Sequence, residues 1–158
     1  MERLSLSNKL YCDGSQNPLS IPNAWASVVY QDGTDAVEKH QELFRDLKLS
    51  KNGIKSFAVT NFNDVASSQN NGAELIGLVM ALRIANLENI DEIYCDSQLL
   101  VDYWSKGHIN PKTKRTMDTK KLSYILECSE LRRKFELKGG KITKIFGNVN
   151  KADFGFHK

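Results

Sequence analysis

Four acidic residues are the strongest chemical signal in this sequence. Asp13 and Asp96 each end an apolar run, LYCD and IYCD, and each precedes a small residue. Glu74 stands at the start of a long apolar stretch, and Asp153 lies near the C-terminus. Clustered carboxylates repel one another, so such a set is stable only with divalent cations, and oxygen ligands select Mg²⁺ or Mn²⁺. Two such ions about 4 Å apart can activate a water and stabilise a leaving oxygen, so the set is typical of phosphodiester hydrolysis.

Each acid also has an ordinary structural explanation. Glu74 falls in the first turn of a predicted helix, where the helix dipole favours an acid. Asp13 and Asp96 are predicted at the C-terminal ends of strands, where open α/β sheets build their sites, although a single such acid is more often a cap or a surface charge. The metal-site hypothesis therefore depends on a fold that brings all four side chains together.

The apolar pattern predicts an initial run of strands and then alternating helices and strands. Strands are predicted at 9–13, 24–30, 56–62, 92–96 and 141–146. Helices are predicted at 73–85, with Asn70 and Asn71 as capping residues, at 97–106 and at 118–138, with an additional helix at 35–49. This order indicates an α/β fold in which helices cover a mixed sheet.

Length and composition limit the class of protein. The chain of 158 residues is 41% hydrophobic, so we expect a single domain over 1–158 with one core. No stretch approaches the roughly 18–20 apolar residues of a membrane helix, and the first ten residues lack the apolar core of a signal peptide. Three cysteines without CxxC spacing argue against a disulfide framework and against a zinc site. We expect an intracellular, cytoplasmic monomer in a reducing compartment, with the nucleus also open.

Charge is distributed unevenly along the chain. Residues 1–111 carry 9 Lys and Arg against 14 Asp and Glu, whereas residues 112–158 carry 13 against 5. The overall charge of +3 is therefore the sum of −5 for residues 1–111 and +8 for residues 112–158. A basic segment on a globular domain is the expected footprint of a phosphate backbone, although solvated surface lysines give the same composition.

The sequence resembles the type 1 ribonuclease H family in four short motifs. These are CDGSQNP at 12–18, SQNNGAEL at 68–75, YCDSQLLVDYW at 94–104 and NKAD at 150–153. They occur in the family's order and leave out only the segment around 34–54. The resemblance implies a ribonuclease H-like fold with a five-stranded mixed sheet, three antiparallel strands and then parallel ones, flanked by helices. In this chain an extra helix would join the second and third strands, and the C-terminal helix would be truncated.

The resemblance also implies an activity and a metal site. A member of this family is an endonuclease that hydrolyses the RNA strand of an RNA/DNA hybrid, leaving 5′-phosphate and 3′-hydroxyl ends. Asp13 would bridge two Mg²⁺ ions, for which Mn²⁺ can substitute. Asp153 would hold the ion nearer the attacking water, and Glu74 with Asp96 would hold the other.

By the same resemblance, polar side chains would bind the hybrid. The implied minor-groove residues are the amides Asn17, Asn70, Asn71 and Gln98. An amide donates and accepts, as does the 2′-hydroxyl that marks RNA, although capping and turns also use amides. The implied contacts to the DNA strand come from a basic run, Lys106, Lys112, Lys114, Arg115, Lys120 and Lys121, with Trp104 beside it. Trp104 also lies at helical spacing from Leu100, which is typical of a core residue.

Three departures from the family pattern affect these expectations. The loop FGNVN at 146–150 has no histidine where the family usually has one, so we expect slower turnover. Only residues 154–158 follow Asp153, so this carboxylate is expected to be held less rigidly. The extra segment near 34–54 is expected at the sheet end away from the carboxylates, where it would shape stability or a partner surface.

Two other functions compete with hybrid cleavage. One is a catalytically silent nucleic-acid-binding module, and the presence of all four acids argues against it. The other is a nuclease of the same fold acting on a different nucleic acid, since resolvases, integrases and exonucleases use similar carboxylate sets. The paired asparagines before Glu74 and the Asp-Ser-Gln motif favour the hybrid.

Overall fold

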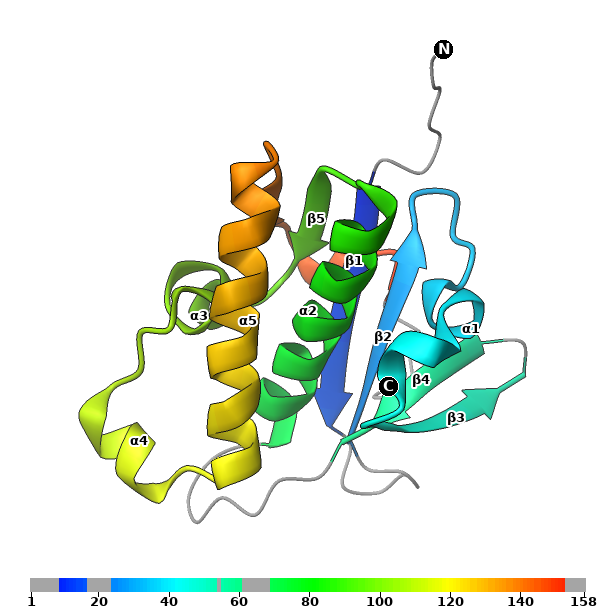
Figure 1. Cartoon of the computed structure of the whole chain (residues 1–158). Coiled ribbons are helices and arrows are strands. Elements are labelled where there is room, and N and C mark those ends of the chain that lie inside the picture. The colour runs from blue at the N-terminus through cyan, green and yellow to red at the C-terminus, as the bar shows by residue number, and fades with distance from the viewer. Residues whose placement is uncertain (1–8, 17–23, 54, 61–68, 153–158) are drawn as a thin grey trace.

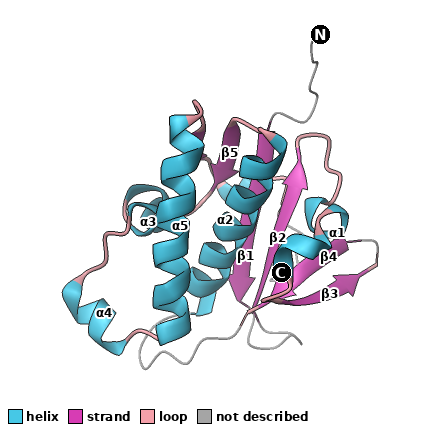
Figure 2. Ribbon diagram, in the orientation of Figure 1, coloured by secondary structure: helices cyan, strands magenta, loops and turns pink. Residues whose placement is uncertain are grey.

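A mixed sheet forms the centre of the fold. The computed structural model describes residues 9–16, 24–53, 55–60 and 69–152, and in this part of the chain six strands are ordered β3-β4-β2-β1-β5-β6 (Figure 1, Figure 2). They are β1 (Lys9–Gln16), β2 (Ala24–Tyr30), β3 (Lys48–Asn52), β4 (Lys55–Val59), β5 (Glu92–Cys95) and β6 (Lys141–Lys144). The first four strands pair antiparallel, while β5 runs parallel to β1 and β6 parallel to β5. The predicted α/β class with a mixed sheet is confirmed, with one strand more than expected.

Two long helices cover one face of this sheet (Figure 1). α2 (Gln69–Glu88) packs against β1 and β2, and α5 (Thr119–Leu137) lies beside α2. The short helices are α1 (Ala36–Lys39), α3 (Gln98–Asp102) and α4 (Pro111–Thr116). α4 was not predicted, although Asn110 caps it by accepting a hydrogen bond from the Lys112 amide. No helix in the described part of the chain combines the length and the apolar composition that crossing a membrane requires.

The additional helix predicted at 35–49 is only partly present. Its start is α1, where Asp35 accepts a hydrogen bond from the Val37 amide at 2.9 Å, and a 3₁₀ helix follows at Gln41–Phe44. A turn follows at 45–47, and the last two residues of the predicted helix begin β3, which pairs with β4 and adds the sixth strand. Leu47 and Leu49 alternate with exposed residues, which is the period of a strand. The prediction was wrong here because Leu47 also fits a helical spacing.

Several other boundaries differ from the predictions. The strand predicted at 9–13 continues to Gln16, because β2 pairs with it as far as Gln16 opposite Ala24. The strands predicted at 56–62 and 141–146 end at Val59 and Lys144. The helix predicted at 97–106 breaks at Tyr103, so α3 is followed by a separate 3₁₀ helix at Trp104–Lys106. The truncated C-terminal helix expected at 154–158 lies outside the described residues.

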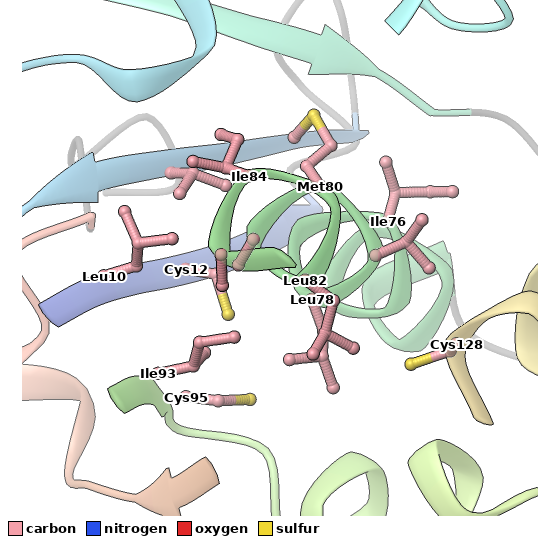
Figure 3. Close-up of a cluster of buried hydrophobic side chains, with 14 of the residues drawn as sticks. Leu10, Cys12, Ile76, Leu78, Met80, Leu82, Ile84, Ile93, Cys95 and Cys128 are labelled. Carbon is pink, nitrogen blue, oxygen red and sulfur yellow. The ribbon is translucent and has the colours of Figure 1, made fainter. Parts of the chain in front are cut away.

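The core lies between α2 and the sheet. Figure 3 shows side chains of α2 gathered with Leu10 and Cys12 of β1 and with Ile93 and Cys95 of β5. Across residues 72–85 of α2, only Glu74 and Arg83 are not buried. A helix that is apolar on all sides is an enclosed helix. These two polar residues therefore need particular partners.

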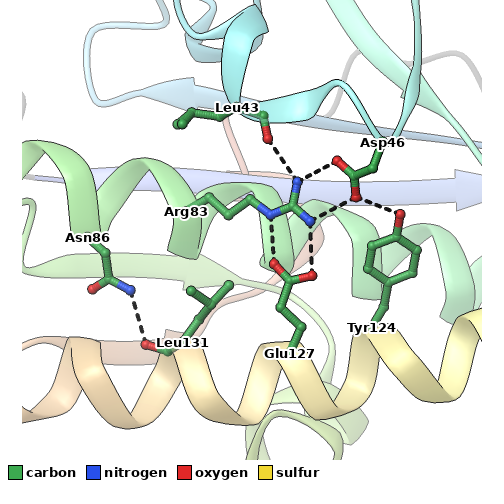
Figure 4. A network of polar contacts seen from close by, with 7 residues as sticks. All are labelled: Leu43, Asp46, Arg83, Asn86, Tyr124, Glu127 and Leu131. Carbon is green, nitrogen blue, oxygen red and sulfur yellow. Dashed lines mark hydrogen bonds and ion pairs between the residues drawn. The ribbon is translucent and has the colours of Figure 1, made fainter.

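Arg83 finds its partners in α5 and in the turn after α1 (Figure 4). Its guanidinium donates to both carboxylate oxygens of Asp46 at 2.8 and 2.9 Å and to both of Glu127 at 2.7 and 2.9 Å. It also donates to the carbonyl oxygen of Leu43 at 2.9 Å, and the Tyr124 hydroxyl donates to Asp46 at 2.8 Å. The hydrogen bonds from Arg83 hold the pKa of Asp46 below its ordinary value. The extra segment is thus fixed to the helical layer.

Candidate metal centre

Asp13 lies inside β1, not at its end as predicted. It pairs with Ser27 of β2 and is 7% exposed. β5 pairs with β1 only at residues 9–11, so β1 continues past the end of this pairing before it reaches Asp13. Strand side chains alternate between the two faces, and Leu10 and Cys12 belong to the core under α2. The alternation therefore sets Asp13 apart from Leu10 and Cys12, at a position of β1 beyond its pairing with β5.

Two glycines allow α2 to touch β1 next to Asp13. A Cβ added to Gly14 would lie 2.1 Å from the carbonyl carbon of Ala73. A Cβ added to Gly77 would lie 2.9 Å from the carbonyl oxygen of Asp13. The backbones can approach this closely only because glycine has no side chain. Since Glu74 follows Ala73 and precedes Gly77 by about one turn, this contact brings Glu74 to the level of Asp13.

Asp96 reaches the same place from the end of β5. It follows Cys95, the last residue of β5, and precedes Ser97, which caps α3 by accepting a hydrogen bond from the Leu100 amide at 3.3 Å. The loop after β6 lies on its other side, where a Cβ added to Gly147 would come 3.2 Å from Asp96 Oδ2. Asp96 is therefore held between the start of α3 and this loop.

Asp13, Glu74 and Asp96 form one cluster. A carboxylate oxygen from each lies within 4.8 Å of the other two. Among the described residues this is the one group of three or more His, Cys, Asp or Glu side chains with that spacing. The structure thus brings together three of the four predicted acids, from β1, α2 and the residue after β5.

The cluster is electrostatically unfavourable without a counter-charge. The pKa of Glu74 is raised from 4.5 to about 8, first by burial and then by the negative charge of Asp96, against an opposing hydrogen bond with Ser97. A divalent cation would remove this repulsion. The donor set consists of carboxylate oxygens, which suit Mg²⁺ or Mn²⁺ rather than zinc. The residues present therefore fit the predicted metal.

The cysteines beside these acids do not add ligands. Cys12, Cys95 and Cys128, all within the described residues, are free and buried, as expected for a chain without a disulfide framework. A hydrogen bond with Cys95, together with burial, raises the pKa of Cys12 well above its ordinary value. Cys12 is therefore a thiol, and metal ligation requires the thiolate.

The fourth predicted acid, Asp153, lies outside the described residues. Of the residues just before it, Asn150 and Ala152 are buried and Lys151 is exposed. Asn150 Nδ2 donates to the carbonyl oxygen of Cys12 at 2.9 Å, and Ser27 Oγ donates to the carbonyl oxygen of Ala152 at 2.7 Å. Sequence reasoning missed both contacts because the partners are 138 and 125 residues apart. It also missed Gly77, for which a glycine inside an apolar helix was the available signal.

The predicted amide residues have different placements. Asn17 lies outside the described residues, and Asn70 lies in α2 with a side chain that is not described. Asn71 is half-buried. Both asparagines are inside α2, so their predicted capping role is wrong, and Glu74 consequently lies beyond the first turn. Gln98 is exposed at the start of α3, where its Nε2 donates to Asp102.

Trp104 is a core residue and not the exposed stacking surface considered from the sequence. It is 4% exposed, with the ammonium of Lys121 5.2 Å from its ring centroid. Its spacing from Leu100 reflects shared burial, since both belong to the core. Of the other predicted DNA contacts, Lys112, Lys114 and Arg115 lie on α4, which has no buried residue. Lys106 ends the 3₁₀ helix Trp104–Lys106, and Lys120 and Lys121 lie at the start of α5. Lys121 is 1% exposed, so its prediction as a DNA contact is wrong.

Comparisons with known proteins give distant structural similarity only. No family model matches the sequence, and no curated protein matches it. RNase H1 from the halophilic archaeon Halobacterium salinarum NRC-1 is 21% identical with a TM-score of 0.43, covering 92% of this chain and 90% of that chain. The N-terminal RNase H domain of rv2228c from Mycobacterium tuberculosis, solved as a fusion with maltose binding protein, is 16% identical with a TM-score of 0.46, covering 92% and 86%.

Proposed function

We propose that this chain is a metal-dependent nuclease that hydrolyses the RNA strand of RNA/DNA hybrids. The observation that carries the proposal is the cluster of Asp13, Glu74 and Asp96, whose carboxylate oxygens lie within 4.8 Å of one another. Such a cluster costs stability, as the raised pKa of Glu74 indicates. A group of perturbed carboxylates drawn from three separate elements supports a site for chemistry.

Two Mg²⁺ ions, for which Mn²⁺ can substitute, are the proposed cofactors. Asp13 would contact both ions, Glu74 and Asp96 would hold one, and Asp153 would hold the other. When bound, two such ions supply an activated water and stabilise the leaving oxygen in an in-line attack on phosphate. The products would carry 5′-phosphate and 3′-hydroxyl ends.

The protein's own contribution is to hold the carboxylates before the metal binds. The contacts at Gly14 and Gly77 fix α2 against β1, so Glu74 cannot move away from Asp13 without disturbing backbone packing. Ser97 adds a hydrogen bond to Glu74 next to Asp96. Ligands held in this way require little rearrangement on metal binding.

Recognition of the hybrid is assigned to amide and basic side chains. Asn71 lies three residues before Glu74, which is a same-side spacing on a helix, and Gln98 lies two residues after Asp96. Their amides can donate to and accept from the 2′-hydroxyl that distinguishes RNA from DNA. Asn17 and Asn70 are proposed to join them. The cationic side chains on α4 would contact phosphates of the DNA strand.

Cleavage assays test this function against its alternatives. A labelled RNA/DNA hybrid is incubated with Mg²⁺ or Mn²⁺, beside RNA/RNA and DNA/DNA duplexes and a four-way junction. Asp13→Asn should abolish metal-dependent cutting of the hybrid, whereas Asp91→Asn, at an exposed position outside the cluster, should not. Hybrid binding without cutting would support a silent module. Preferential cutting of duplex DNA or of the junction would support a different nucleic-acid substrate.

We further propose that the chain acts as a single-domain monomer in a reducing, intracellular compartment. The three free, buried thiols support this environment. Size-exclusion chromatography with light scattering at micromolar concentration tests the oligomeric state.

A further inference from the structure

The loop after β6 joins the ends of β5 and β1 beside the carboxylate cluster. At its start, the Ile145 amide donates to the carbonyl oxygen of Cys95 at 2.9 Å. At its end, the side chain of Asn150 donates to the carbonyl oxygen of Cys12 at 2.9 Å. Each of these cysteines precedes a carboxylate of the cluster. Both ends of the loop are therefore attached to backbone next to a candidate metal ligand.

The loop is also held by its own turn. It contains a 3₁₀ helix at Gly147–Val149, and the Val149 amide donates to the carbonyl oxygen of Phe146 at 3.1 Å. A Cβ added to Gly147 would lie 3.2 Å from Asp96 Oδ2, so the backbone of the loop lies against the cluster. A loop fixed in this way presents its exposed side chains in defined positions.

Two apolar side chains of this loop are exposed. Phe146 is 74% exposed and Val149 is 56% exposed. Apolar side chains that are exposed together mark a contact surface. The half-buried Lys144 places its ammonium 4.9 Å from the centroid of the Phe146 ring, so a positive charge accompanies the apolar group. Residues 146–150 carry no titratable side chain. The loop can therefore act on a ligand through contact, and not through proton transfer.

We propose that Phe146 and Val149 pack against sugar rings of the RNA strand next to the phosphate that is cut, with Lys144 near a neighbouring phosphate. The inference rests on the proposed function, because it takes the cluster beside the loop as the place where the RNA strand is cut. RNA helices have a wide, shallow minor groove that displays the 2′-hydroxyls. Side chains of a short loop can reach the apolar C–H faces of the sugars in such a groove, and the contact removes apolar surface from water.

Tryptophan fluorescence tests this contact, because both native tryptophans are buried. Trp25 is 0% exposed and Trp104 is 4% exposed, so acrylamide should quench mainly the indole introduced by Phe146→Trp. The variant is made together with Asp13→Asn, which prevents cutting in Mg²⁺, and anisotropy of the labelled hybrid shows when binding is saturated. Saturating hybrid should remove most of the acrylamide quenching of the introduced indole.

Leu137→Trp is the matched control. Leu137 is 76% exposed and ends α5, just before β6 begins at the end of the sheet away from the cluster. The quenching of this variant should be the same with and without the hybrid. In anisotropy titrations, Phe146→Ser should weaken hybrid binding by about 10-fold, which corresponds to burial of about 60 Å² of apolar surface. Val149→Ser should weaken it less, and Leu137→Ser should leave it unchanged.

The outcomes separate this contact from the proposed function. Unchanged quenching of Phe146→Trp at saturation, or equal protection of Phe146→Trp and Leu137→Trp, would overturn the inference even if the wild type cuts the hybrid. Protection of Phe146→Trp alone, in a protein whose wild type binds the hybrid without cutting it, supports the contact and contradicts the proposed activity. Failure of the wild type to bind the hybrid contradicts both.

Discussion

Glu74 should make the metal-free protein less stable as the pH rises. Its pKa is about 8 in the folded protein against 4.5 for an ordinary glutamate, so between these values the folded state keeps a proton that the unfolded state has lost. Stability then falls with pH, because the unfolded state binds fewer protons. At about 1.4 kcal/mol for each pH unit, the full effect is about 5 kcal/mol, of which about 3 kcal/mol falls between pH 5.5 and 8. This is a large part of the 5–15 kcal/mol that typically stabilises a domain.

Urea unfolding in EDTA at several pH values measures this effect. Wild-type protein and the exposed-site control Asp91→Asn should lose about 3 kcal/mol between pH 5.5 and 8, whereas Glu74→Gln should lose much less because it cannot ionise. Adding Mn²⁺ at pH 8 should restore the stability of the wild type. Parallel curves for wild type and Glu74→Gln would refute the reasoning, since they would mean that Glu74 is ionised in the folded state at neutral pH.

Three further results are expected. Gly77→Ala should weaken Mn²⁺ binding, because the added Cβ would lie 2.9 Å from the Asp13 carbonyl oxygen. It should also lower the free energy of unfolding, because an overpacking cost of about 1–3 kcal/mol should exceed the gain in helix propensity of about 1 kcal/mol. Urea unfolding and Mn²⁺ titration check it, and a more stable variant with normal affinity would contradict it. Arg83→Met should lower the free energy of unfolding by about 2 kcal/mol, between the values for exposed and buried ion pairs, because Asp46 and Glu127 lose their common partner. The Mn²⁺ affinity of this variant, measured below the unfolding transition, should stay normal. If Arg83→Met lost Mn²⁺ affinity as well as stability, the network around Arg83 would also support the carboxylate cluster. Replacing Lys112, Lys114 and Arg115 with Gln should reduce the slope of log affinity for the hybrid against log salt by about 0.7–0.9 per lost phosphate contact. Fluorescence anisotropy in EDTA measures this slope. The control replaces Arg133, Lys134 and Lys141 with Gln. If both triple variants gave the same slope, α4 would not contact the phosphate backbone of the hybrid.

Sequence periodicity predicted the fold wherever one pattern dominated. The strand at 24–30 and the helix at 118–138 agree with β2 and α5, because β2 is buried along its whole length and α5 has an unbroken helical spacing. The prediction failed around Leu47, where the same leucines satisfy a helical period from Leu43 and a strand period with Leu49. Only pairing with β4 decides between them, and a partner strand is not visible in local sequence.

The acids of the candidate site could be predicted from the sequence, because they lie beside apolar runs. Asp13, Glu74 and Asp96 were found in this way, because a carboxylate next to a buried segment is easily recognised. The contacts that attach residues 150–152 to β1 and β2 could not be found, since Ser27 and Asn150 meet partners 125 and 138 residues away. Trp104 is a residue whose role the sequence could not decide. Helical spacing could not separate a core aromatic from a stacking surface, and only its 4% exposure decides this.

The same helix carries the group that costs stability and the group that offsets this cost. In residues 72–85 of α2, Glu74 and Arg83 are the two side chains that are not buried, and they lie at different ends of the helix. Glu74 opposes folding at neutral pH until a cation is bound, because its half-buried carboxylate must either hold a proton or ionise beside Asp96. Arg83 joins α2 to α5 and to the segment after α1 through two paired carboxylates. An anchor at one end of α2 therefore allows the other end to keep an unfavourable carboxylate in place for the metal.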